Sequence, residues 1–140
     1  MECKVSWLGK GGMAFSAETG SGHLVSMDGA PEAGGRNLAP RPMELLLAGA
    51  GGCSAFDVVL ILQRSRQAVS ACDVNLQAER ATEDPKVFTK INLHFMVKGK
   101  DLDQAKVDRA VKLSHEKYCS ATTMLAKTAE LTYSVEVISE

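Results

Sequence analysis

Apolar and polar residues alternate in several separate stretches of the chain, which is the pattern of strands that bury one face. Glycines and a proline occupy the turns between these stretches. Cys3 and Cys72 fall on the apolar faces, so we expect both to point into the core. Six strands are predicted in this way, over residues 3–7, 13–19, 23–27, 69–79, 87–97 and 130–137.

A long apolar segment separates the first three strands from the others. It begins at Pro42, is almost continuously apolar from 45 to 62, and ends at Arg64 and Arg66. Its length would suit a membrane span, but it contains Asp57 and several glycines. A helix that is apolar on all sides is otherwise a buried helix of a globular core. The pattern therefore predicts a central buried helix and no membrane partner.

Two further helices are expected in the last third of the chain. One runs from Asp101, whose side chain would cap it in a capping box with Gln104, to about Lys117. A shorter one surrounds Leu125. The resulting order βββ-α-ββ-α-β predicts an α+β fold, and a length of 140 residues suits a single domain over 1–140.

The composition and the first residues of the chain limit which binding partners and which cellular compartment we expect. The net charge is −1, which gives no attraction to nucleic acid or to an anionic membrane. The first residues lack a basic start followed by an apolar run, so we expect a cytoplasmic protein. In that reducing compartment the four cysteines would not form a permanent structural disulfide. No two of them share a metal-ligand spacing, so we expect neither a metal nor a cofactor.

The remaining cysteines, Cys53 and Cys119, are the candidates for chemistry. The alternative for each is a small apolar residue that simply packs, and for Cys53 the sequence taken alone favours that alternative. For Cys53 to be reactive, a cation must stabilise its thiolate. Arg36 and Arg41, in the Gly- and Pro-rich segment before the helix, are the nearest candidates in the sequence, and ordinary surface charge is the alternative for both.

Two other titratable residues lie four positions from these cysteines. His115 would share a helix face with Cys119 if the helix persists, where it would act as a base or simply sit at the helix end. Asp57 follows Cys53 by one helical turn and needs a partner, because burying an unpaired carboxylate is costly. A structural pairing is favoured for Asp57, since an anion beside Cys53 would oppose thiolate formation.

The segment PMELLLAGAGGCSAFDVV, followed much later by YCSATTML and a final alternating strand, resembles the OsmC/Ohr family. These are the osmotically inducible and organic hydroperoxide resistance proteins, and the nearest likeness is to a less-characterised OsmC-like branch. The resemblance covers essentially the whole chain. It implies an intertwined homodimer in which antiparallel sheets wrap around central helices.

The resemblance also implies a chemistry. Cys53 matches the peroxidatic cysteine of a thiol-dependent peroxidase that reduces organic hydroperoxides, and Cys119 matches the resolving cysteine. An external dithiol would restore both thiols.

In the family, an arginine and a glutamate hold the thiolate. Here Met43 occupies the glutamate position and the carboxylate follows at Glu44, while the first hairpin has Gly11, Gly12 and Met13 where an arginine might fall. Arg36 is then the first candidate for the cation and Arg41 the second. Ser120 also replaces the proline that typically follows the second cysteine.

A second function, of a different class, remains open. A non-catalytic protein with the same fold would bind a small apolar ligand at its dimer interface. The cysteine pair favours the peroxidase, and the departures from the family pattern favour the binding protein.

Overall fold

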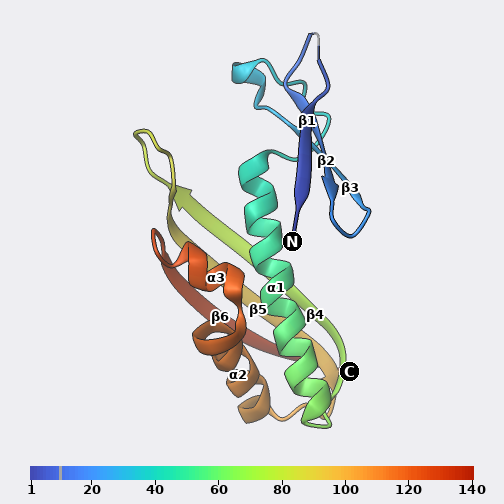
Figure 1. The fold of residues 1–140 in the computed structure, drawn as a ribbon. Coiled ribbons are helices and arrows are strands. Elements are labelled where there is room, and N and C mark those ends of the chain that lie inside the picture. The colour runs from blue at the N-terminus through green and yellow to red at the C-terminus, as the bar shows by residue number, and fades with distance from the viewer. Residues whose placement is uncertain (10) are drawn as a thin grey trace. The chain divides into compact units, whose positions relative to one another are not determined.

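The structure is a computed structural model that describes residues 1–9 and 11–140 (Figure 1). The order of strands and main helices is the predicted one. The elements are β1 (Cys3–Trp7), β2 (Ala14–Thr19), β3 (Leu24–Asp28), η1 (Pro31–Ala33), α1 (Pro42–Arg64), β4 (Ala68–Arg80), β5 (Phe88–Lys100), α2 (Gln104–Leu113), η2 (Ser114–Tyr118), α3 (Ser120–Leu125) and β6 (Glu130–Ser139). The chain divides into two compact units, Met1–Leu47 and Ala48–Glu140, with the boundary inside α1.

The first unit is built on an antiparallel meander in the order β1-β2-β3. Every residue of β1 is exposed in this chain, including Cys3. The prediction that Cys3 points into the core is therefore wrong. The alternation of apolar and polar residues along β1 predicts the strand correctly. However, nothing in the described part of the first unit packs on the apolar side of β1, which is an edge strand.

A buried carboxylate organises the loop that follows the meander. Asp28, at the end of β3, is only 1% exposed and accepts hydrogen bonds from the backbone N–H groups of Gly29, Arg36 and Leu38 at 2.8, 3.0 and 3.1 Å. These bonds, first that from Leu38 and then that from Arg36, hold the pKa of Asp28 below its ordinary value despite burial. The loop that carries Arg36 is thus tied to the sheet through its backbone.

The second unit contains a sheet in the order β4-β5-β6. β4 and β5 form the predicted antiparallel hairpin, but β6 runs parallel to β5, so this sheet is mixed rather than wholly antiparallel. The difference arises from the connection, because α2, η2 and α3 return the chain to the end of the sheet at which β5 starts (Figure 1). A parallel pair requires such a helical crossover.

The core of the second unit follows the alternation along β5. Ile91, Leu93, Phe95 and Val97 are buried, as predicted. At the start of the strand Phe88 is buried instead of Val87, where a shift in register between β4 and β5 reverses the alternation. Helix α2 buries a stripe with helical spacing against this sheet, made by Val107, Ala110 and Val111.

The helical segment after β5 differs in detail from the prediction. Helix α2 begins at Gln104 and its cap is Asp103, which accepts a hydrogen bond from the N–H of Ala105 at 2.9 Å. The predicted cap, Asp101, instead adopts a left-handed conformation (φ 51°) in the preceding turn. The short helix expected around Leu125 is present as α3.

In the second unit, α1 contacts the sheet closely at Gly51. A methyl group built on Gly51 would lie 2.7 Å from Cδ1 of Leu76 on β4, so glycine permits the close approach. Only one stripe of the helix is buried in this single chain, and Phe56 remains 67% exposed. Among the described residues, α1 is also the one helix long and apolar enough to cross a membrane, a test that core helices pass as well.

Close packing of β4 and β5 leads to the first testable prediction. Gly99 is buried, and a methyl group there would collide with the backbone carbonyl of Ala68, which cannot rotate away as a side chain could. We expect Gly99→Ala to lower the free energy of unfolding by about 1–3 kcal/mol, measured by urea denaturation. Lys100→Ala, at the exposed neighbouring position, should change it by less than about 0.5 kcal/mol. Equal stabilities for the two variants would contradict this packing.

Candidate functional site

Two cysteines far apart in the sequence lie side by side in the second unit. The Sγ atoms of Cys53 and Cys119 and a carboxylate oxygen of Asp57 all lie within 4.8 Å of one another. Both thiols are free; Cys119 is fully buried, while Cys53 and Asp57 are half-buried. The structure thus brings together the two cysteines that the sequence singles out.

A change of helix type places Cys119 at this site. After α2 the chain widens into one turn of π-helix, η2, and the N–H of Cys119 donates to the carbonyl of Ser114 at 2.9 Å. Cys119 itself is extended (φ −71°, ψ 99°) and forms the N-cap of α3. Its Sγ accepts a hydrogen bond from the N–H of Thr122 at 3.5 Å and another from Oγ of Ser54 at 3.2 Å.

These contacts give Cys119 an unusual thiol. Burial raises its pKa, but hydrogen bonds from Ser54, from Thr122 and from Cys53 outweigh burial and bring the pKa below its ordinary value. Cys72 shows the opposite behaviour, because burial, and then the charge of Asp73, raises its pKa to about 11. The surroundings therefore favour the thiolate at Cys119 and the inert thiol at Cys72.

Asp57 finds the partner that its position requires. Oγ of Ser114 donates to Oδ2 of Asp57 at 3.1 Å and also lies 3.4 Å from the carbonyl oxygen of Ser54. Ser114 is buried, so this bond is shielded from water. The expectation that Asp57 has a structural pairing is met by a hydroxyl group from η2.

Sequence reasoning missed Ser54 and Ser114, which are 2% and 1% exposed. Ser54 had a signal, because it lies between Gly51 and Val58 on one face of a helix whose other buried residues are apolar. Ser114 had none, since only the packing of η2 on α1 reveals its contact with Asp57.

His115 does not take the position expected of a base. The ring of His115 lies against the ring of Tyr133, with centroids 4.9 Å apart. Four-residue spacing predicts a shared face only in a continuing α-helix. The π-turn at η2 and the extended backbone of Cys119 break that relation.

Comparisons with known proteins decide the family. Residues 34–134 match the family model described as OsmC-like protein. Protein YhfA of Escherichia coli strain K12 is 51% identical over 139 residues, which cover 99% of both chains.

The chain belongs to the OsmC family.

Solved structures agree with this assignment. A hypothetical protein from Aquifex aeolicus superposes on 99% of this chain and 96% of its own, with a TM-score of 0.85 and 29% identity. An organic hydroperoxide resistance protein OsmC from Legionella pneumophila shares the fold over 98% of both chains, with a TM-score of 0.68 and 18% identity.

The OsmC-family pattern leaves open which residue supplies the positive charge that would stabilise the Cys53 thiolate. Both candidates, Arg36 and Arg41, lie in the first unit. Arg36 extends its side chain along the first hairpin. A methyl group on Gly11 would lie 3.1 Å from Nη2 of Arg36, and one on Gly12 would lie 3.6 Å from its Nε. Arg36 thus delivers a guanidinium to the hairpin in which the family resemblance expects an arginine, and the two glycines leave room for it.

Glu44 has a different function within the first unit. Its Oε2 accepts a hydrogen bond from the backbone N–H of Arg41 at 2.9 Å. Because α1 begins at Pro42, this bond is the glutamate half of a capping box. The carboxylate therefore fixes the entry of the chain into the helix.

A cavity of this OsmC-family chain is lined in part by Asp57, whose carboxylate also belongs to the cluster with the two cysteines. It has a volume of about 330 Å³ and borders on Asp57. Its walls are largely apolar, and Arg64 contributes a positive charge at one side. The other side chains that line it are Leu60, Ile61, Ser65, Leu113 and Tyr118.

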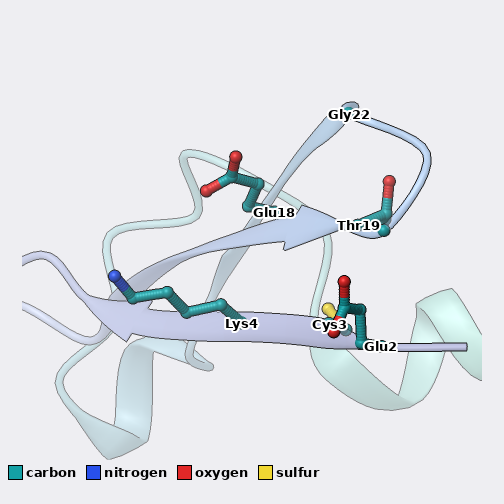
Figure 2. A pocket seen from close by; sticks show the side chains of 7 residues that line it. Glu2, Cys3, Lys4, Glu18, Thr19 and Gly22 are labelled. Atoms are coloured by element: carbon teal, nitrogen blue, oxygen red, sulfur yellow. The ribbon is translucent and has the colours of Figure 1, made fainter.

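A second hollow, of about 340 Å³, lies along β1 and β2 in the first unit (Figure 2). Charges of both signs line it, from Glu2, Lys4 and Glu18, together with the thiol of Cys3. Cys3 contributes the one sulfur among the side chains labelled in Figure 2, whereas Cys53 and Cys119 lie together in the second unit.

The hydrogen bond from Ser54 can be tested directly. We expect Ser54→Ala to raise the pKa of Cys119, because a donor to the thiolate is lost. The chemical shift of ¹³C-labelled cysteine Cβ, followed against pH by NMR, measures this. Ser70→Ala, which removes an exposed hydroxyl, should leave the titration unchanged.

The same variant should show a matching pH dependence of stability. The folded-state pKa of Cys119 lies below that of a free thiol, so its contribution to stability is complete above the unfolded-state pKa and is lost as pH falls through the folded-state pKa. The stability difference between wild type and Ser54→Ala should therefore grow from neutral toward alkaline pH. A constant difference would contradict a thiolate held by Ser54.

Proposed function

We propose that this protein is a thiol-dependent peroxidase that reduces organic hydroperoxides, with Cys53 as the peroxidatic and Cys119 as the resolving cysteine. The observation that carries the proposal is the proximity of two free thiols, with Sγ atoms no more than 4.8 Å apart. Membership of the OsmC family supports it, and one fold relative is named an organic hydroperoxide resistance protein.

The reaction proceeds in three balanced steps. The Cys53 thiolate attacks the O–O bond, takes one oxygen to become a sulfenic acid, and the alkoxide leaves as an alcohol after protonation. The Cys119 thiolate then displaces hydroxide from that sulfur, which is protonated to water, and a disulfide forms. An external dithiol reduces the disulfide by exchange and is itself oxidised to a disulfide. No cofactor is required in this scheme.

Burial supports this division between the two thiols. Cys53 is half-buried and can meet a peroxide, whereas Cys119 is fully buried and is shielded from it. The resolving step needs a nucleophile that is already ionised, and Ser54 and Thr122 favour the thiolate of Cys119. Cys119 is thus suited to condensation with its neighbour and poorly suited to attack on a substrate from solvent.

Activation of Cys53 requires a positive charge, which we assign to Arg36. The backbone of Arg36 is held by Asp28, and its guanidinium lies at the first hairpin. Arg41 is the second candidate. Glu44, which caps the start of α1, positions the segment between these arginines and the helix without contacting the thiol.

We further propose that the protein is a homodimer and that it is located in the cytoplasm. Neither nucleic acid nor a membrane is a partner in this proposal. Large apolar side chains are exposed in the single chain, among them Trp7 at 57%, Leu24 at 74% and Phe56 at 67%. Contiguous exposure of such residues marks association surfaces. A second copy of the chain would cover the sides of α1 that the single chain leaves open.

The cavity beside Asp57 supports a second candidate function, the binding of a small apolar ligand without catalysis. Its volume of about 330 Å³ falls in the range of small-molecule sites, and Leu60, Ile61 and Leu113 provide apolar walls. Binding with no turnover of hydroperoxide by the reduced protein would favour this function.

Substitution of each cysteine should separate the steps. With cumene hydroperoxide and dihydrolipoamide, Cys53→Ser should lose turnover, because no sulfenic acid can form. With the dithiol left out, Cys119→Ser should still consume one equivalent of peroxide per chain and accumulate a sulfenic acid that a dimedone probe traps. Cys72→Ser is the matched control and should turn over as wild type does. Full turnover by Cys53→Ser would refute the mechanism.

The proposed cation can be tested by the pH dependence of Cys53 alkylation in the Cys119→Ser background. Arg36→Ala should shift the midpoint to higher pH, since a positive charge near the sulfur favours the thiolate. Arg41→Ala should shift it less. If the parent and both arginine variants share the midpoint of a free cysteine, about pH 8.5, the site is not activated and ligand binding becomes the better proposal.

A further inference from the structure

We propose that Cys53, Asp57 and Cys119 form a binding site for a divalent cation of the zinc type. Two thiols and one carboxylate converge with their ligand atoms within 4.8 Å of one another. The spacing of cysteines in the sequence predicts no metal site, because it tests only neighbours along the chain. Here the fold supplies the third ligand from a distant segment.

The geometry suits a tetrahedral ion. A zinc–sulfur distance of about 2.3 Å places two ligands of a tetrahedron about 3.8 Å apart. The three ligand atoms therefore need to approach one another by no more than about 1 Å, the difference from their observed limit of 4.8 Å. Cys53 and Asp57 lie one turn apart on α1, and Cys119 stands at the start of α3, so small side-chain rotations suffice.

Hydrogen bonds already orient two of the three ligands. Ser114 donates to Oδ2 of Asp57 at 3.1 Å, which leaves Oδ1 for a metal. Ser54 donates to Sγ of Cys119 at 3.2 Å. Both serines are buried, so these bonds persist without competition from water. Outer contacts of this kind fix the ligand geometry of metal sites.

The charges at the site also favour a cation. Two thiolates and a carboxylate this close together would repel one another without a cation between them, and an ion of charge +2 that displaces the thiol protons converts that repulsion into attraction. Asp57 does not assist the proposed peroxidase reaction, because an anion beside the cysteines opposes thiolate formation. Thiolate ligands select zinc over magnesium or calcium, which prefer oxygen.

The cavity lined by Asp57 is the opening through which we expect an ion and a fourth ligand to reach the cluster. It is bordered by Asp57 and Arg64, and Asp57 belongs to both the cavity and the cysteine cluster. A water molecule or a small anion beside Arg64 would complete the tetrahedron. Three protein ligands with one open position are typical of zinc sites that exchange their fourth ligand.

This inference does not depend on peroxidase activity. A bound ion would hold both thiolates and prevent the disulfide from forming, so metal binding and turnover exclude each other at any moment. Metal binding is measured without peroxide, and turnover is measured in the presence of a chelator. Failure of one therefore leaves the other unaffected.

The test uses reduced, chelator-treated full-length protein titrated anaerobically with Co²⁺ and then with Zn²⁺. We expect one ion per chain, a sulfur-to-cobalt charge-transfer absorption, and the visible bands of tetrahedral cobalt, all displaced by zinc. Ser114→Ala should weaken zinc binding by about 10–100-fold, measured against a chromophoric chelator. Asp57→Asn should weaken it at least as much, and Cys53→Ser should remove the charge-transfer absorption.

Matched controls are Asp73→Asn and Cys3→Ser, which should bind zinc as wild type does. Thermal unfolding without metal shows whether each variant folds, and added zinc should raise the melting temperature only where the three ligands are intact. The proposal would be overturned by any one of three results. These are a stoichiometry below one ion per chain, a cobalt spectrum without thiolate charge-transfer absorption, or an unchanged affinity in Asp57→Asn.

Discussion

The approach of α1 to β4 at Gly51 is the contact on which the rest of the site depends. No side chain separates the helix from Leu76 at this point, so the helix backbone lies close to the sheet. Cys53, Ser54 and Asp57 follow within two turns on the same helix, and their positions are set by that contact. A larger residue at position 51 would have to displace the side chain of Leu76, which packs against this part of α1.

The pattern of apolar residues predicted the elements because apolar residues recur with a characteristic period in a strand and in a helix. Alternation marked the strands, and the apolar run marked α1. The prediction was wrong where a neighbour decides the outcome. Cys3 lies on an apolar face but is exposed, because burial depends on what covers a strand. Asp103 replaced Asp101 as the cap, because both residues suit that position and only the backbone conformation distinguishes them.

The candidate site was predictable to a similar extent. The pairing of Cys53 with Cys119 followed from a family resemblance, and the structure brings the two together. The serines that surround them were not foreseen, since a hydroxyl gains meaning only from the group that it faces. Arg36 was chosen for its proximity in sequence; its guanidinium lies beside Gly11 and Gly12 within the first unit, and its action on Cys53 stays a prediction.

The parallel pairing of β5 with β6 has a consequence for how the site is assembled. Antiparallel hairpins can close as soon as two strands exist, but a parallel pair must wait for its crossover, and closing a longer loop costs more entropy. Cys119 lies within that crossover, between α2 and α3. During synthesis, α1 with Cys53 is therefore made well before the segment that carries Cys119 is held in place by the sheet. The segment that carries Cys119 is therefore among the last to be fixed by the sheet, so reactivity of the two thiols as a pair would report a late stage of folding.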